Sequence, residues 1–140
     1  MPQGAADTAH PGPGEIHRRC AESYAQVLEG RLEDALKLID PEVVDHRGGT
    51  QGDHRGRDAW RQRWEQVSAD SAFRDISLTI EQNIVSGDTS ANRYTLRGTH
   101  TDSGRRYAVL VMDMVRVRNG RIVEHWSLLD TDAMRNQLGL

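Results

Sequence analysis

The sequence predicts a single α+β domain in which helices come first and a curved antiparallel sheet follows. Between residues 15 and 69 apolar side chains recur every three or four positions, the period of a helix, and from residue 73 onward they recur every second position, the period of a strand. Turn sequences SGDT, DSG and RNG separate four extended runs, 73–86, 90–101, 105–118 and 121–130. A long sheet of this kind curls, and helices on its concave face leave a pocket. We therefore expect a cone-shaped sheet, mixed or antiparallel, that encloses a pocket beneath the N-terminal helices.

The helical part of the chain divides into three segments, 15–29, 31–39 and 57–69. Gly30 can end the first helix, and the second must stop before Pro41, because the residue before a proline avoids the helical region. The third presents Trp60 and Trp64 on one apolar face. A short strand, 42–46, and a glycine-rich loop, 47–56, are expected between the second and third helices.

Composition narrows the class of protein. The chain has 140 residues, 36% of them apolar and 28% charged, with a net charge of −3 and one cysteine, Cys20. We expect a flexible leader over 1–14 and one domain over 15–140. No apolar run is long enough for a membrane span, and no basic stripe indicates a nucleic-acid partner. A lone cysteine and no signal-peptide pattern favour the reducing cytoplasm.

The turn at Asn119-Gly120 decides which side chains meet across the last two strands. A two-residue turn would set Asp113 opposite Trp126, whereas a three-residue loop with a bulge at Gly120 would set Asp113 opposite His125. We favour the second register, because it groups Asp113, His125 and Ser127 within an apolar face. The reverse face then collects apolar side chains expected to contact a second subunit: Leu110, Met112, Met114, Trp126 and Leu128.

A carboxylate facing an imidazole inside an apolar cavity can share a proton with it. Asp113 would orient His125 and raise its basicity, and such a pair suits proton removal next to a carbonyl. We therefore predict Asp113 and His125 as catalytic residues. The alternative is a structural hydrogen bond between two buried polar groups that satisfy each other.

Several further side chains are candidates for binding a small apolar or polycyclic molecule. His100 shares a strand face with Tyr94 and is expected to hydrogen-bond a substrate oxygen. The other candidates lie on the predicted helices, at the mouth of the pocket or on the last strand: Tyr24, Val27, Trp60, Trp64, His46 and Ser127. His46, His54, His100 and Asp113 could be imagined as metal ligands, but the HxH and HExxH spacings are missing, so no metal is expected. Asp130 precedes TDAMRNQL and is expected to cap a short helix.

The segment GRRYAVLVMDMVRVRNGRIVEHWSLLDTDAMRNQLG, with PEVVDHRG and HRGRDAW upstream, resembles the SnoaL-like polyketide cyclases of the nuclear transport factor 2-like superfamily. The resemblance extends from about residue 16 to the C-terminus. It implies a homodimer or tetramer that closes a ring in a polyketide ester by intramolecular aldol condensation, with no metal or organic cofactor. In that family an acid/base Asp occupies the position of Ser127, and a pocket His occupies the position of Asp113.

That departure leaves three functions open. In the first, the protein is an active cyclase or isomerase whose catalytic carboxylate has moved to Asp113. In the second, it is a non-catalytic ligand-binding or accessory dimer. In the third, it is a hydrolase or dehydratase in which Asp113 and His125 activate water. The limonene epoxide hydrolases are similar in fold, but their Asp–Arg–Asp set would fall on Tyr94, Leu96 and Ser127. None of these matches, so epoxide opening by that mechanism is disfavoured.

Overall fold

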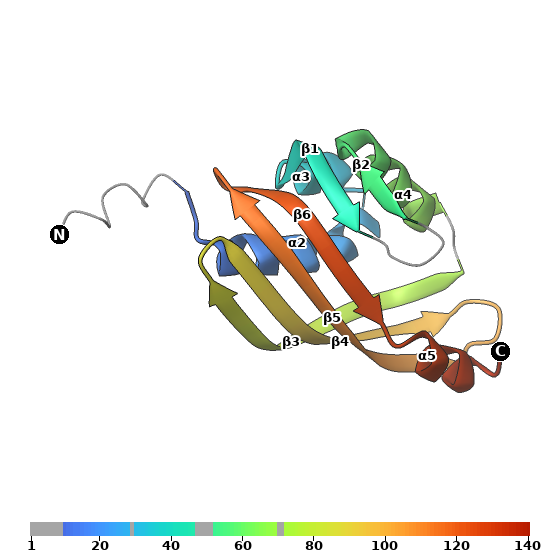
Figure 1. Cartoon of the computed structure of the whole chain (residues 1–140). Coiled ribbons are helices and arrows are strands. Elements are labelled where there is room, and N and C mark those ends of the chain that lie inside the picture. Colours follow the sequence, from blue (N-terminus) through green and yellow to red (C-terminus); the bar gives the residue numbers. More distant parts are fainter. Residues whose placement is uncertain (1–9, 29, 47–51, 70–71) are drawn as a thin grey trace.

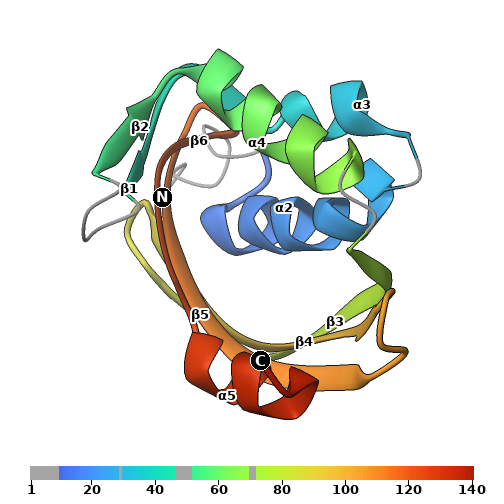
Figure 2. The same ribbon diagram turned by 90° about the vertical axis from the view of Figure 1, so that its right-hand side faces the viewer.

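A six-stranded sheet wraps around three helices in the computed structural model, which describes residues 10–28, 30–46, 52–69 and 72–140. The elements in chain order are α2 (Pro13–Leu28), α3 (Leu32–Leu36), β1 (Ile39–His46), β2 (Asp53–Arg55), α4 (Arg57–Ala69), β3 (Phe73–Ser86), β4 (Thr89–His100), β5 (Arg106–Arg118), β6 (Arg121–Leu129) and α5 (Thr131–Leu138). The strand order is β2-β1-β6-β5-β4-β3. Figure 2 shows the sheet as a curved wall with α2, α3 and α4 on its concave side. The predicted α+β class is confirmed.

The four long strands predicted from the alternating pattern are present, each within a residue or two of its expected bounds. Two features differ between residues 31 and 56. The second helix ends at Leu36 rather than at 39, because β1 begins at Ile39 and runs through Pro41. The predicted loop contains β2, which pairs with β1 in antiparallel fashion. β1 pairs with β6 in parallel, and this makes the sheet mixed.

The core fills the space between the helices and the concave face of the sheet. Its buried residues come from α2, α3, α4, β1, β5 and β6: Ile16, Cys20, Val27, Ala35, Leu36, Ile39, Val43, Trp60, Trp64, Val115, Val117 and Ile122. Burial of each large apolar side chain contributes about 1.5–3 kcal/mol before the entropy of ordering is subtracted. In the described part of the chain, no helix is both long and apolar enough to cross a bilayer.

The β5–β6 turn does not have the predicted geometry. Asn119 and Gly120 have φ values of 53° and 73°, so they form a two-residue turn that needs the left-handed conformation at both positions. The predicted three-residue loop is therefore wrong. The irregularity lies further along β6, where Val123 is inserted between the pairs Val117↔Ile122 and Arg116↔Glu124.

This bulge preserves the predicted face but shifts the partners. Asp113 is opposite Ser127, and His125 is opposite Val115. Because the inserted residue moves the parity of β6 by one, Asp113 and His125 still project from the same concave face, as diagonal neighbours rather than as a direct pair. The predicted grouping is confirmed, and the predicted direct opposition is wrong.

The C-terminal helix α5 continues beside β5 where β6 ends. Asp130 caps it by accepting a hydrogen bond from the Ala133 amide at 3.0 Å, which confirms the predicted cap. The Gln137 side chain then takes the place of a neighbouring strand: it accepts from the Ala108 amide at 2.7 Å and donates to the Ala108 carbonyl at 3.0 Å. These two bonds satisfy backbone groups of β5 that β6 does not reach.

Candidate active site

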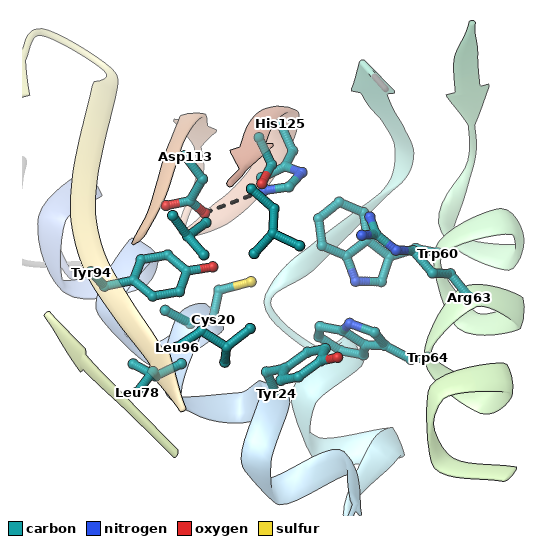
Figure 3. Close-up of a pocket in the computed structure, with 14 residues that line it drawn as sticks. Cys20, Tyr24, Trp60, Arg63, Trp64, Leu78, Tyr94, Leu96, Asp113 and His125 are labelled. Carbon is teal, nitrogen blue, oxygen red and sulfur yellow. Dashed lines mark hydrogen bonds and ion pairs between the residues drawn. The ribbon is translucent and has the colours of Figure 1, made fainter. Parts of the chain in front are cut away.

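A cavity of about 170 Å³ lies between α2, α4 and the concave face of the sheet (Figure 3). Leucine and valine side chains cover one part of it: Leu78, Leu96, Val111 and Leu129. The aromatic side chains Tyr24, Trp60, Trp64 and Tyr94 line it as well, together with the polar groups Arg63, Asp113, His125 and Ser127. A carboxylate in such surroundings is costly unless it is paired, so its partners are informative.

Asp113 has an imidazole at each carboxylate oxygen. His125 Nε2 lies 3.3 Å from Oδ2, and His17 Nε2 lies 2.9 Å from Oδ1. The Asp113 side chain is only 9% exposed. Burial alone would raise the pKa of Asp113, but the hydrogen bonds from His125 and His17 outweigh it and hold that pKa below its ordinary value. Asp113 is therefore an anion at neutral pH, and it borders the cavity.

His125 lies between two carboxylates. Its Nδ1 atom is 2.9 Å from Asp45 Oδ1, and its Nε2 atom faces Asp113. Burial acts to lower the pKa of His125, yet the hydrogen bonds to Asp113 and Asp45 prevail and raise it. An imidazole with an acceptor at each nitrogen is most stable as the imidazolium, which donates at both. The edge of the ring packs against Trp60, with centroids 5.1 Å apart.

Asp45 comes from the parallel pair of β1 and β6, where it stands beside His125 in the register. Its carboxylate is 4% exposed and also accepts a hydrogen bond from Arg63 at 3.3 Å. Asp45 is not among the residues predicted from the sequence, because a five-residue extended run does not reveal which distant strand it joins. The pair Asp45-His46 did contain a signal: successive residues of a strand point to opposite faces, so one of these two polar side chains had to face the concave side of the sheet.

His17 was missed as well. It lies on α2, is fully buried and has Nδ1 2.8 Å from the Ser90 hydroxyl. The helical period of the sequence identified only the apolar stripe through Ile16 and Cys20 as buried. In the structure the curved sheet surrounds α2, so a second face of this helix is also covered (Figure 2). A histidine directly beside that stripe was the available signal.

The predicted binding residues divide into two groups. Tyr24, Trp60, Trp64, Tyr94 and Ser127 line the cavity as expected. Val27, His46 and His100 do not.

Each of the three misplaced residues has a physical reason. Val27 is 1% exposed within the core formed with α3 and β1. His46 follows Asp45 in the strand and so points to the outer face, where it stacks on Trp126 at 4.9 Å. His100 has the predicted strand parity, but it lies at the far end of β4, where its ring hydrogen-bonds Ser103 at 2.7 Å.

Two phenol groups face the cavity without a protein partner. Neither the Tyr24 nor the Tyr94 hydroxyl hydrogen-bonds another residue in the described part of the chain. Burial raises the pKa of both tyrosines, and for Tyr94 the charge of Asp113 adds to the effect. Both hydroxyls therefore stay protonated and can donate to a ligand oxygen. Figure 3 shows the Tyr94 hydroxyl directed into the cavity on the side of Asp113.

The described residues contain no cluster of three His, Cys, Asp or Glu side chains arranged to hold a metal ion. The set imagined from the sequence is dispersed, since His46 lies on the outer face and His100 at the end of β4. The titratable groups at the site instead form a chain in which carboxylates and imidazoles alternate: Asp45, His125, Asp113 and His17.

The model of the SnoaL-like polyketide cyclase family matches residues 18–138. Among solved structures, IdmH from Streptomyces antibioticus, described as a candidate polyketide cyclase, is 35% identical, with a TM-score of 0.73 over 89% of this chain and 99% of that one. TsrD from Streptomyces laurentii is 25% identical, with a TM-score of 0.72 over 89% of this chain and 92% of that one. AclR from Streptomyces galilaeus, described as a candidate hydroxylase, is 22% identical, with a TM-score of 0.71 over 89% of this chain and 96% of that one. At this level of identity the similarity shows the fold alone.

A search of curated protein sequences found no match. The family model nevertheless covers most of the chain, and the solved relatives share the arrangement of helices over a curved sheet. The chain belongs to the SnoaL-like polyketide cyclase family and has its nuclear transport factor 2-like fold.

Proposed function

We propose that the protein is an acid/base enzyme that works without a cofactor and closes a ring in an apolar, carbonyl-bearing molecule by an intramolecular aldol reaction, or isomerises such a molecule. One observation carries the proposal: the Asp113 carboxylate and the His125 imidazole lie side by side at the wall of an otherwise largely apolar cavity. A buried base next to a buried acid, both facing a space for substrate, is the arrangement that proton transfer at carbon requires.

The ring closure can be written with these two residues alone. Asp113 takes a proton from the carbon next to one carbonyl and leaves an enolate. The enolate carbon attacks a second carbonyl of the same molecule, forming the new carbon–carbon bond and an alkoxide. His125 gives its Nε2 proton to the alkoxide, and Asp113 returns the abstracted proton to His125. The cycle ends with both groups in their starting states. For isomerisation, the enolate is reprotonated at another carbon.

The neighbouring groups fit this chemistry. A phenol such as Tyr94 can donate to the enolate oxygen, where negative charge develops. The apolar walls exclude water and so strengthen each hydrogen bond inside the cavity. Tyr24, Trp60 and Trp64 supply flat surfaces for an unsaturated or cyclic substrate.

The placement of Asp113 supports a moved carboxylate rather than a lost one. Ser127 occupies the position at which the resemblance to the family placed the acid/base Asp, and Asp113 stands directly opposite it in the β5–β6 pair. Directly opposed residues have Cβ atoms about 5 Å apart, so a carboxylate at either position reaches the same part of the cavity.

Heptane-2,6-dione provides a test, because its terminal methyl carbon can close onto the distant carbonyl to give 3-hydroxy-3-methylcyclohexanone. The wild-type protein should form this product faster than buffer. Asp113→Asn should lower the protein-dependent rate by about 100-fold or more, the usual contribution of a general base. Asp88→Asn, which changes an exposed carboxylate beside Arg116 and Arg118, is the matched control and should retain the rate. Equal rates for wild type and Asp113→Asn would refute the proposal.

A second candidate is a non-catalytic protein that binds a small molecule, and Ser127 at the family Asp position favours it. Such a protein would bind a cyclic ketone such as 2-tetralone and release it unchanged, with its α-hydrogens exchanging in D₂O no faster than in buffer. Catalysed exchange would exclude this candidate.

We also propose that the outer sheet face forms a homodimer or a tetramer. Leu110, Met112, Met114 and Leu128 project from this face with 41%, 54%, 36% and 79% of their surface exposed. Contiguous apolar surface of this kind marks interfaces. We expect light scattering after gel filtration to give at least twice the monomer mass for wild type and the monomer mass for Leu128→Lys. Lys37→Ala, which changes an exposed side chain at the end of α3 on the other side of the sheet, is the control and should keep the wild-type mass. A wild-type monomer at micromolar concentration would contradict this expectation.

A further inference from the structure

The polar chain through the cavity continues beyond Asp113 into α2. His17 contacts the carboxylate oxygen that His125 does not, with Nε2 2.9 Å from Oδ1. In the described part of the chain, Oδ1 has no other hydrogen-bond donor. His17 is fully buried and does not line the cavity. It therefore cannot touch a substrate, but it can act on one through Asp113.

The hydrogen bonds on the other side of His17 define where its proton lies. The Ser90 hydroxyl is 2.8 Å from Nδ1 and also accepts from the Asn83 amide at 2.8 Å. With that amide as donor, Nδ1 is the one acceptor in the described residues for the hydrogen of the Ser90 hydroxyl. Nδ1 is then unprotonated, and the ring is neutral with its hydrogen on Nε2, pointed at Asp113.

We infer that His17 is a positioning residue: as a neutral imidazole protonated at Nε2, it fixes the Asp113 carboxylate so that the other oxygen faces His125 and the cavity. The inference rests on the proposed role of Asp113 as the base. A neutral donor suits that role, since a second imidazolium would attract the carboxylate more strongly and make it a weaker base. The rotation of a carboxylate held at one oxygen is also restricted, which places the reacting oxygen.

Groups from every surrounding element act on Asp113, and they must be separated from the effect of His17. Cys20 from α2 and Tyr94 from β4 are neutral neighbours, since burial raises the pKa of both. His125 from β6 is the cation that Asp113 shares with Asp45, and Arg63 from α4 lines the same cavity. A change at position 17 leaves all of these in place, so a change in the titration of Asp113 reports the loss of one donor.

The test is an NMR titration that needs no substrate. In protein labelled with ¹⁵N-histidine and ¹³C-aspartate, long-range imidazole spectra give the tautomer of each ring, and the carboxyl signal missing from Asp113→Asn identifies Asp113. At neutral pH, His17 should show a protonated Nε2 and an unprotonated Nδ1, and His125 should be protonated at both nitrogens. His17→Leu removes the donor and should raise the titration midpoint of Asp113 by about one pH unit or more.

His17→Gln is the conservative variant, because its amide can donate to Oδ1, and it should keep the midpoint within about half a unit of wild type. His100→Leu changes another histidine outside the cavity and should leave the midpoint unaltered. A His17 ring protonated at Nδ1, or equal midpoints in wild type and His17→Leu, would overturn the inference. If His17→Leu does not fold, the wild-type tautomer and the His17→Gln midpoint decide. Failure of ring closure with heptane-2,6-dione would count against the proposed function alone, because these titrations contain no substrate.

Discussion

The Nδ1 atom of His125 lies 2.9 Å from an Asp45 carboxylate oxygen, across the parallel pair of β1 and β6. This contact joins the N-terminal and C-terminal parts of the fold at the candidate site. Because Asp113 takes the other nitrogen of the ring, the second carboxylate makes the imidazolium the favoured form. The proton donor of the proposed reaction thus depends on a residue outside the set that lines the cavity.

Asp45→Asn should therefore destabilise the fold and also lower the rate of the proposed reaction. The variant leaves the His125 imidazolium with one carboxylate and removes the ionic partner of Arg63. Breaking a buried ion pair by removing one charge costs about 3 kcal/mol, so the free energy of unfolding in urea should fall by about that amount. Asp53→Asn, on an exposed carboxylate of β2, is the control and should cost less than about 1 kcal/mol. Equal stability of Asp45→Asn and wild type would show that this pair is not formed.

The raised pKa of His125 predicts how stability varies with pH. A group whose pKa is higher in the folded state than in the unfolded state stabilises the fold most below its unfolded value, here about 6.5, and loses that contribution as pH rises through the folded value. Thermal melts should therefore show Tm decreasing above pH 6.5. The pKa of His46 is also raised, chiefly by its hydrogen bond with Glu124. The informative quantity is therefore the difference in Tm between wild type and His125→Gln. That difference should shrink as pH rises; a constant difference would contradict a charged His125.

Sequence patterns predicted much of this molecule, because the information was local. The alternation in residues 73–130 is set by which face of each strand is buried, and Gly120 marks a turn wherever the strands lead. The face shared by Asp113 and His125 followed from parity, although the turn type was wrong. Two opposite errors, an expected bulge at Gly120 and an unseen one at Val123, leave the same face buried.

The partners of the site could not be found in the same way. Asp45 and His17 lie 80 and 96 residues from the side chains they contact. Their positions depend on how β1 adds to the sheet and how far the sheet curves around α2, and neither is written in a local period. His100 shows the converse limit: its face was predicted, but its distance along β4 from the cavity depends on the register between strands.

The opposition of Asp113 and Ser127 predicts that the catalytic carboxylate can be placed on either strand. Since the two positions are opposite each other, the double variant Asp113→Ser/Ser127→Asp keeps one carboxylate at the same level of the cavity. It should recover at least about 10-fold of the ring-closing rate that Asp113→Ser loses, measured with heptane-2,6-dione, because a general base contributes about 100-fold or more. Ser103→Asp in the Asp113→Ser background adds a carboxylate outside the cavity and should recover nothing. A double variant as inactive as Asp113→Ser would mean that the base must stand on β5.

The first chemical step can be measured by itself, as exchange of the α-hydrogens of 2-tetralone for deuterium in D₂O, followed by proton NMR. We expect wild-type protein and Asp88→Asn to accelerate this exchange equally over buffer, and Asp113→Asn to lower the protein-dependent rate by about 100-fold or more. Exchange by Asp113→Asn at the wild-type rate would show that another group removes the proton and would refute the role of Asp113 as the base.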